Sequence, residues 1–329
     1  MVKIAIAGAG GQLAREIIDA FVETGRHEIL GLMRKDTSAQ PSLPGVTWVQ
    51  NKFDDKAELV RLLAGVNTVL CFFTVEKDEG ARAQKLLIDA AVEAGVPRYI
   101  PSEWSMGASL KANIHTAPHY ANKLLVREYL ADLNNRNNSG KKVLEYTLLW
   151  PGLFANYLGF PHKTTAHVSA FEIFMNIDAG VAIAVEGHAD ARVAFTTMAD
   201  LSRAVVRIVE YEGEWPVNGG LRGESIRYAD LLELATRLRG SAAPPMEVEW
   251  VKMEDLEAGR LATKWLPKLD HPAMASGLTE EMSRGFLVGI VRALAVGGWD
   301  TSDEWNKLLP DMEFTGLERF LTPLFKGKQ

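Results

Sequence analysis

A glycine-rich turn close to the start of the chain constrains the fold more than any other feature. Lys3–Ala7 has the apolar character of a buried strand, and Gly8–Ala14 (GAGGQLA) follows it directly. A helical pattern then begins at Gln12. A strand, a glycine turn and a helix in this order are typical of a dinucleotide-binding turn.

Each position in this turn has a physical task. Gly8 permits the tight turn, and Gly10 lets the backbone approach a pyrophosphate closely, where the amides and positive end of the helix hold its charge. Ala14 stands in place of a third glycine, a change of one methyl group. The alternative is a doubly wound domain in which this loop only turns the chain and binds no cofactor. The predicted cofactor contacts of the turn are Gly8, Gly10, Gly11, Gln12 and Leu13.

Strand and helix patterns alternate through the first 155 residues. Alternation with near-continuous apolar strands predicts a parallel sheet covered on both faces, a doubly wound (Rossmann) α/β fold. The expected strands are Lys3–Ala7, Glu28–Met33, Val46–Gln50, Thr68–Phe73, Arg98–Pro101 and Glu145–Trp150, and the expected helices are Gln12–Thr24, Glu79–Ala94 and Tyr120–Leu133. The polar stretch Asn134–Lys142 is interpreted as a loop.

A chain of 329 residues is longer than one core usually supports, so we expect two lobes. Residues 1–158 are predicted to form a dinucleotide-binding domain, to which parts of about 190–225 return, and residues 159–329 mainly a smaller mixed α/β substrate domain. The strands expected after Pro151 are Val181–Val185, Arg192–Phe195 and Glu247–Val251, and the helices are Met198–Tyr211, Tyr228–Leu238, Thr279–Leu294 and Gly316–Leu324.

The end of the second expected strand indicates which dinucleotide binds. An NAD-binding chain places an acidic residue there to hold the ribose hydroxyls. This chain has Arg34 and Lys35, and its first carboxylate is Asp36. Because the guanidinium fork of Arg34 suits a 2′-phosphate and Lys35 adds positive charge, NADP is favoured over NAD.

Three further segments carry a family resemblance. They are Pro97–Gly107 (PRYIPSEWSMG), Tyr120–Ala131 (YANKLLVREYLA) and Tyr146–Leu158 (YTLLWPGLFANYL). Together with the glycine turn, they resemble the isoflavone reductase-like proteins, which are atypical short-chain dehydrogenases/reductases alongside the NmrA-like regulators. The resemblance covers most of residues 1–160 and is weaker beyond.

The resemblance implies an NADPH-dependent reductase of aromatic or phenolic natural products in secondary metabolism, with Lys123 as the essential lysine. An ammonium at Lys123 can hold the nicotinamide ribose and stabilise negative charge that develops on a substrate oxygen. Further cofactor contacts are expected from Phe73, Thr74, Lys123, Pro151, Gly152 and Phe154. Substrate contacts are expected from Trp104, Met106, Tyr157, Phe160 and His162, whose aromatic character suits a flat substrate.

Other side chains near Lys123 are secondary catalytic candidates. Tyr120 lies three residues before Lys123, so a proton relay is one reading and an aromatic pocket wall is the other; the family typically has Phe there. His119 could relay a proton, although a loop histidine without a chemical role is the simpler reading. Glu103 is expected to order its loop rather than act as a base. The single cysteine, Cys71, lies in the apolar run TVLCFF and is expected to be inert.

Composition restricts the partners. The net charge of −6 argues against nucleic acid as a partner. The sequence has no run of 18 apolar residues, so it predicts no membrane-spanning helix. No histidine or acidic cluster has metal-ligand spacing. We expect a cytoplasmic monomer or homodimer that transfers hydride to a ketone, enone or quinone-methide-like substrate. The alternative is a non-catalytic dinucleotide sensor that regulates a protein partner.

Overall fold

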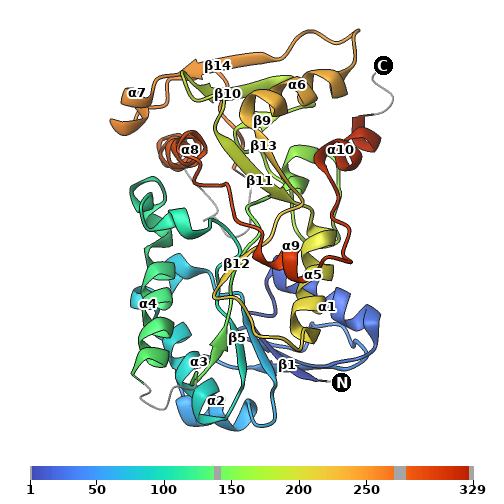
Figure 1. The fold of residues 1–329 in the computed structure, drawn as a ribbon, viewed down its shortest axis with the longest axis vertical. Helices are drawn as coiled ribbons and strands as arrows, with labels where there is room; N and C mark the ends of the chain where they lie inside the picture. The colour runs from blue at the N-terminus through green and yellow to red at the C-terminus, as the bar shows by residue number, and fades with distance from the viewer. Residues whose placement is uncertain (1, 137–141, 270–278, 326–329) are drawn as a thin grey trace. The chain divides into compact units, whose positions relative to one another are not determined.

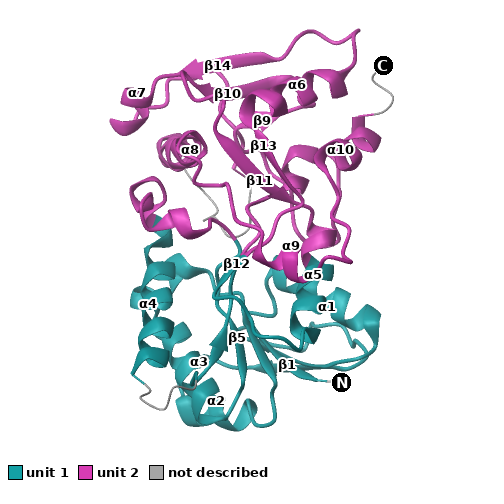
Figure 2. Ribbon diagram, viewed as in Figure 1, with its two compact units in different colours: residues 1–104, 119–149, 202–219 teal, residues 105–118, 150–201, 220–329 magenta. Residues whose placement is uncertain are grey.

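The computed structural model describes residues 2–136, 142–269 and 279–325. The chain forms two compact units (Figure 2). Unit 1 consists of residues 1–104, 119–149 and 202–219, and unit 2 consists of residues 105–118, 150–201 and 220–329. Unit 1 is therefore assembled from three separate stretches of sequence. The assignment of separate cofactor and substrate domains stays a prediction.

A six-stranded parallel sheet forms the centre of unit 1 (Figure 1). The strand order is β3-β2-β1-β4-β5-β6, which reverses direction between β1 and β4. The strands are β1 (Lys3–Ala7), β2 (Glu28–Met33), β3 (Val46–Gln50), β4 (Thr68–Cys71), β5 (Arg98–Ile100) and β6 (Glu145–Tyr146). The predicted doubly wound sheet is confirmed. Ligands of such sheets bind at the carboxyl ends of the strands, next to the point of reversal.

Helices cover both faces of this sheet. Figure 1 shows α1 (Gln12–Thr24) and α5 (Met198–Glu210) on one side, and α2 (Lys56–Leu62), α3 (Arg82–Glu93) and α4 (Ala121–Asn135) on the other. The crossover from β1 to β2 runs along the sheet in the opposite direction to the crossover from β3 to β4. Because both crossovers are right-handed, their helices lie on opposite faces of the sheet. The sequence predicted a helical stretch before Gly65, without bounds, and α2 is that helix. The buried side chains of α1 are Ala14, Ile17, Ile18 and Phe21.

Three predicted boundaries need correction. The expected helix Glu79–Ala94 begins only at Arg82, because Gly80 and Ala81 have positive φ angles of 62° and 58°. The Asp78 carboxylate accepts hydrogen bonds from the amides of Ala83 and Gln84, at 2.8 and 3.0 Å, and so holds the start of the helix. Strands β4 and β5 end one or two residues earlier than predicted, which leaves Phe72, Phe73 and Pro101 in connecting segments.

The expected strand Glu145–Trp150 is two strands. After β6, Thr147 interrupts the pairing, and β7 (Leu148–Trp150) pairs instead with β12 (Asn218–Gly220). The loop expected at Asn134–Lys142 is partly helical. Asn134 lies inside α4, where its side-chain oxygen accepts hydrogen bonds from the amides of Val143 and Leu144. Residues 137–141 lie outside the described residues.

Unit 2 contains two small three-stranded sheets, with orders β14-β10-β9 and β13-β11-β8. Helix α8 packs against β10, and α6 packs against α10. The strands are β8 (Leu153–Phe154), β9 (Met175–Asn176), β10 (Val181–Val185), β11 (Arg192–Thr196), β13 (Glu224–Arg227) and β14 (Glu247–Val251). The helices are α6 (Tyr228–Arg239), α7 (Met253–Glu257), α8 (Glu280–Ala295), α9 (Glu304–Leu308) and α10 (Leu317–Phe325). The mixed α/β character predicted for this part is confirmed.

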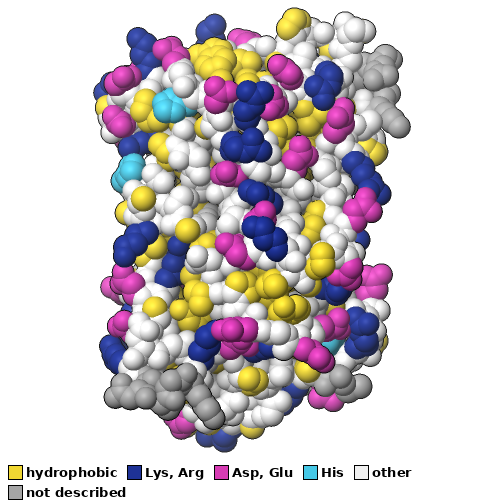
Figure 3. Space-filling view, in the orientation of Figure 1, with side chains coloured by type: hydrophobic (Ala, Val, Ile, Leu, Met, Phe, Trp, Pro, Cys, Tyr) yellow, Lys and Arg dark blue, Asp and Glu magenta, His cyan; other side chains and the backbone are white. Residues whose placement is uncertain are grey.

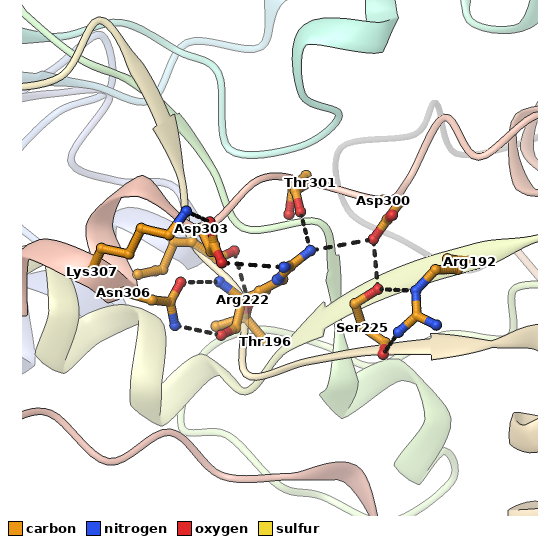
Figure 4. Close-up of polar contacts among 10 residues, drawn as sticks. Arg192, Thr196, Arg222, Ser225, Asp300, Thr301, Asp303, Asn306 and Lys307 are labelled. Atoms are coloured by element: carbon orange, nitrogen blue, oxygen red, sulfur yellow. Dashed lines mark hydrogen bonds and ion pairs between the residues drawn. The ribbon is translucent and has the colours of Figure 1, made fainter. Parts of the chain in front are cut away.

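Charged side chains of both signs are interspersed over the face drawn in Figure 3. Several basic groups of unit 2 are neutralised by defined partners. The Arg222 guanidinium contacts Asp303 at 3.3 Å and Asp300 at 3.6 Å, and it donates to the Thr301 carbonyl at 2.8 Å (Figure 4). Asn306 holds the Arg222 backbone at both its amide and its carbonyl. This network therefore fixes the loop before β13 and does not present an unneutralised arginine to an anion.

Candidate functional site

The glycine turn has the geometry that a phosphate-binding loop requires. Gly8 has a φ of 83°, and a Cβ atom there would lie 2.9 Å from the Phe72 carbonyl oxygen. Gly11 is the N-cap of α1 and, as a glycine, provides no side-chain cap for this helix. The first helical amides therefore remain directed out of the helix, where they can bind an anion. Gln12 and Leu13 form the half-buried start of the helix.

The Met33 side chain leaves little space for a side chain at Gly10. A Cβ atom there would lie 2.8 Å from the terminal methyl group of Met33. Since that methyl group ends a flexible side chain, the restriction is softer than the backbone contact at Gly8. Gly10 itself is exposed, so its backbone is accessible to a ligand.

Arg34 lies exposed directly after β2, beside two aromatic rings. Its guanidinium carbon is 5.6 Å from the ring centre of Phe73 and 5.9 Å from that of Phe53. Lys35 is exposed beside it. The Asp36 carboxylate accepts hydrogen bonds from the amide and hydroxyl of Ser38, which lower the pKa of Asp36. The acidic group is thus engaged within its own loop, while the basic groups face solvent.

Asn51 is a candidate that the sequence pattern did not reveal. It follows β3, is 3% exposed, and its side-chain oxygen accepts a hydrogen bond from the Phe53 amide at 2.7 Å. Its amide nitrogen is buried without a hydrogen-bond partner among the described residues. A buried donor of this kind normally has a partner, so its place between the Met33 and Phe53 backbones fits a polar ligand group. An asparagine after a strand is too common to have indicated this.

Lys123 is the buried cation of α4. Its side chain is 5% exposed, and its ammonium donates to the carbonyl oxygens of Ser102, at 3.2 Å, and Glu103. An ammonium has three donors, so one remains beyond these two bonds. Burial lowers the pKa of Lys123 from its ordinary 10.5 to about 8, which Arg127 reinforces and the negative charge of Glu103 opposes. The group is mostly protonated at neutral pH but close enough to titration to exchange a proton.

The segment that holds Lys123 is itself hydrogen-bonded to α3, to the end of β4 and to the residues after β4. The Ser102 amide donates to the side-chain oxygen of Gln84 at 2.8 Å, and the Ser102 hydroxyl donates to the Phe73 carbonyl at 2.7 Å. The Trp104 indole donates to the Cys71 carbonyl at 2.7 Å. Ser102 and Glu103 are both buried, so these bonds form in a region of low dielectric constant.

Trp104 adopts an unusual backbone conformation, with a φ of 39°. Its ring stacks on Phe72 with centres 4.4 Å apart, and the residue is only 8% exposed. Positive φ values are costly for bulky residues and concentrate at functional sites. The Trp104 ring therefore supports the segment that binds Lys123, and its predicted substrate contact stays a prediction.

The aromatic side chains of His119 and Tyr120 lie in the short turn before α4, which begins at Ala121, one residue later than predicted. The Lys123 ammonium is 4.4 Å from the centre of the Tyr120 ring, and the His119 ring centre is 4.1 Å from that of Tyr120. Burial and the Lys123 charge lower the pKa of His119 to about 4, so His119 is neutral at pH 7. The ammonium lies over the face of the Tyr120 ring, and this contact suits an aromatic wall.

These residues form a continuous set of contacts along one edge of the unit 1 sheet. Gly8 touches Phe72, Phe72 stacks on Trp104, and Ser102 joins Phe73 to Lys123. Thr74 is half-buried at the start of the short turn that follows. Cys71 is fully buried, and burial raises the pKa of its thiol to about 12, so the thiol is inert as expected.

The remaining predicted contacts lie in unit 2. Gly152 has a φ of 69°, and a Cβ atom there would lie 2.4 Å from the Ala194 carbonyl oxygen, so this glycine is required by the approach of β11. The Pro151 carbonyl accepts a hydrogen bond from Thr196 at 2.7 Å. Met106 is fully buried and touches Gly298. For each of these residues the binding role stays a prediction.

Unit 2 gathers three aromatic rings in sequence. Phe154 lies 5.5 Å from Tyr157, which lies 4.5 Å from Phe171, a ring that the sequence analysis did not select. Phe160 is half-buried. His162 instead faces Asp178, at 3.9 Å, and the Phe325 ring. His162 thus belongs to a different cluster from the other predicted substrate contacts.

The described part of the chain contains no group of three or more histidine, cysteine, aspartate or glutamate side chains that could hold a metal ion. Among the same residues no helix is long and apolar enough to cross a membrane.

Comparison with known proteins places the chain in a family. Oxidoreductase swnN of Metarhizium robertsii is 24% identical over all of this chain and 99% of its own length. The structure of the NADPH-dependent quinone oxidoreductase QOR2 of Escherichia coli, complexed with NADPH, matches 98% of this chain and 100% of its own, with a TM-score of 0.65 and 22% identity. That of AtPrR2 with NADP⁺ and (+)-pinoresinol matches 98% of each chain, with a TM-score of 0.67 and 16% identity. The NmrA-like family model matches residues 2–222, about two thirds of the sequence, and the chain belongs to the NmrA-like family.

Proposed function

We propose that this protein is an NADPH-dependent oxidoreductase that reduces a small aromatic or phenolic compound, namely a ketone, an enone or a quinone-methide-like substrate. The observation that carries the proposal is the Lys123 ammonium. It is buried and held by two carbonyls at the same sheet edge as the glycine turn, with one donor left for a ligand. A site used only to sense a dinucleotide does not need a cation with a lowered pKa in this position.

The residues of unit 1 fit a bound dinucleotide phosphate. The amides at the start of α1 would hold the pyrophosphate, and Arg34 with Lys35 would hold the 2′-phosphate. The buried Asn51 amide would donate to the adenosine half of the cofactor. Bound NADPH would supply the hydride.

Lys123 would act on the oxygen of the substrate. As hydride reaches the electrophilic carbon, negative charge develops on the attached oxygen, and the remaining ammonium donor stabilises it. A proton then passes to that oxygen from Lys123, whose pKa of about 8 permits the transfer, or from a water beside it. Tyr120 would form an aromatic wall next to the ammonium.

The substrate class rests on the aromatic side chains and on the relatives. The rings of Phe154, Tyr157 and Phe171 offer flat apolar contacts within unit 2. One structural relative is a quinone oxidoreductase and another binds (+)-pinoresinol. Quinones, aryl enones and pinoresinol are therefore the first compounds to test.

Two measurements on the full-length protein test the proposal. Tryptophan fluorescence titrations with NADPH, NADP⁺, NADH and NAD⁺ should show clear preference for NADPH. Oxidation of NADPH should then be followed with each compound. The Lys123→Met variant should lose turnover but still bind the cofactor through the glycine turn and Arg34, with the contact to the nicotinamide ribose lost. Tight NADPH binding without turnover of any compound, and without discrimination between the reduced and oxidised forms, would favour the sensor.

A further inference from the structure

A second buried charge lies one helical turn beyond Lys123. Arg127 holds the Glu103 carboxylate through both of its oxygens, with Nε to Oε1 at 2.9 Å and Nη2 to Oε2 at 2.6 Å. The Glu103 side chain is 1% exposed and that of Arg127 is 13% exposed. A buried ion pair is weak evidence for a stabilising role, because desolvation of both charges opposes their attraction. The position of the pair indicates another role.

Helix α4 contacts the Ser102–Trp104 segment twice. Lys123 donates to the backbone carbonyls of Ser102 and Glu103, and Arg127 donates to the side chain of the same Glu103. Since residues four apart share one face of a helix, Lys123 and Arg127 approach this segment from the same side. The Glu103 carboxylate is therefore a direct mechanical link between Arg127 and a carbonyl that orients the Lys123 ammonium.

We propose that Arg127 is a positioning residue for Lys123. Its two-bond pair with Glu103 fixes the carbonyls that hold the ammonium, and the two opposite charges of the pair balance each other at that ammonium. The inference rests on the proposed function only for the catalytic use of Lys123. The effect of the Arg127–Glu103 pair on the titration of Lys123 does not depend on the proposed function.

The charges around Lys123 make the two halves of the pair distinguishable. Glu103 and Glu76 act to raise the pKa of Lys123, and Arg127 acts to lower it. The other titratable neighbours are Cys71, His119 and Tyr120, whose ring centre lies 4.4 Å from the ammonium. At pH 7 Cys71 and His119 are both neutral. Removing Arg127 alone leaves Glu103 unbalanced and should raise the pKa of Lys123. Removing the charge of Glu103 alone should lower it.

The titration of Lys123 can be measured without any substrate. The protein is labelled with ¹³C at lysine, the Lys123 Cε signal is followed by NMR against pH, and the signal is assigned by its loss in Lys123→Met. We expect Arg127→Gln to shift the midpoint upward by about one pH unit and Glu103→Gln to shift it downward by about one pH unit. Arg98→Gln is the matched control, because it breaks a partly buried Arg98–Glu145 pair elsewhere in unit 1 and should leave the midpoint unchanged.

A double variant separates charge from position. In Glu103→Gln/Arg127→Gln both buried charges are gone, so the chain avoids an unpaired charge and the midpoint should return close to that of the unaltered protein. The carbonyls of Ser102 and Glu103 lose their fixed position in this variant, so its turnover should be about tenfold or more below that of the unaltered protein. Arg127→Lys keeps the charge but loses the two-bond geometry, and it should show the same combination.

Each outcome bears on a definite statement. Shifts of equal sign in the two single variants, or no shift, would overturn the role of Arg127, and so would full turnover in the double variant. If a single variant fails to fold, the double variant and Arg127→Lys still decide the matter. Midpoints that shift as expected while the pH profile of NADPH-dependent turnover does not follow them would contradict the proposed function and leave the positioning intact.

Discussion

Lys123 is held in the folded protein at an energetic disadvantage. Its pKa falls from an ordinary 10.5 to about 8, chiefly through burial. Between these two pH values the unfolded chain binds more protons at this residue than the folded chain does, so stability rises with pH. The full disadvantage is present below about pH 8, which is the range in which the ammonium is charged and useful for catalysis.

This disadvantage can be measured by comparing the unaltered protein with Lys123→Met. The difference in free energy of unfolding should move in favour of the unaltered protein as pH rises from 8 to 10, by about 2 kcal/mol. Titrating groups far from Lys123 contribute equally to both proteins and cancel in the difference, and His119, whose pKa is about 4, stays neutral between pH 8 and 10. Urea unfolding at several pH values provides the measurement. A difference that is constant, or that falls with pH, would show that folding does not lower the pKa of Lys123.

Arg34 gives a second prediction for a single side chain. Arg34→Ala removes the guanidinium that would hold a 2′-phosphate, so NADPH binding should weaken about ten- to a hundredfold while NADH binding changes little. Arg26 is also an exposed arginine of unit 1, paired with Glu210, and Arg26→Ala should leave both affinities unchanged. Fluorescence titration with the two cofactors checks this. Equal losses for NADPH and NADH would contradict the role of Arg34.

Among the structural elements, the turn from β1 to α1 combines a positive φ angle at Gly8 with a close contact to the backbone of another segment. Gly8 has a positive φ and also lies against the Phe72 carbonyl, whereas Gly25, at the end of the same helix, has a φ of 63° with no atom near its missing Cβ. The two glycines therefore separate the effect of conformation from that of contact.

Substituting alanine at these two glycines should reveal the difference. Gly25→Ala should destabilise the protein by about 1 kcal/mol, which is the strain of a left-handed residue. Gly8→Ala adds displacement of the backbone of the β4 end and should cost at least about 2 kcal/mol more, with weakened cofactor binding. Urea denaturation of both variants checks the order. Equal losses would mean that the Phe72 contact relaxes without cost.

Element boundaries show what the sequence could and could not predict. Apolar runs placed β1 and β2 correctly, because burial on both faces leaves a continuous apolar pattern. The bounds of β3 were also correct, although this edge strand contains no buried residue. The segment Glu145–Trp150 is equally apolar, yet it divides at Thr147, since β7 pairs with a strand some 70 residues later. A local pattern holds no information about such a distant partner.

At the scale of the whole molecule, hydrogen bonds connect the three separate stretches of sequence that form unit 1. Arg98 donates to the carbonyls of Tyr211 and Gly213, and Glu145 accepts from the amide of Trp215, whose ring is 1% exposed. Residues 202–219 thus complete the sheet-and-helix layer from far along the sequence. The match of the family model, residues 2–222, contains all three stretches of this unit.

A fragment that ends at residue 158 should therefore be defective. It lacks α5 and the Trp215 segment, so the sheet face that they cover would be exposed. We expect fragment 1–158 to show no cooperative thermal transition by circular dichroism, in contrast to the full-length chain. A fragment of 1–158 that unfolded cooperatively and bound NADPH would show that residues 202–219 are dispensable.

The candidate site was partly predictable for a related reason. Gly8, Arg34 and Lys123 stand at recognisable offsets in recognisable motifs. The groups that hold Lys123 are backbone carbonyls, which every residue has, and their position depends on the positive φ of Trp104. Arg127 did have a signal, because it lies four residues after Lys123 on the same helix, but only the folded chain shows that its partner is Glu103.

The three-part construction of unit 1 also affects how the chain is made. A ribosome adds about 5–20 residues per second, so several seconds separate the synthesis of Leu149 from that of Gly219. During that interval the nascent sheet has its strands but lacks the last helix and tryptophan of its cover. The newly made chain must therefore pass through a stage with an exposed apolar face, at which a chaperone would be expected to bind.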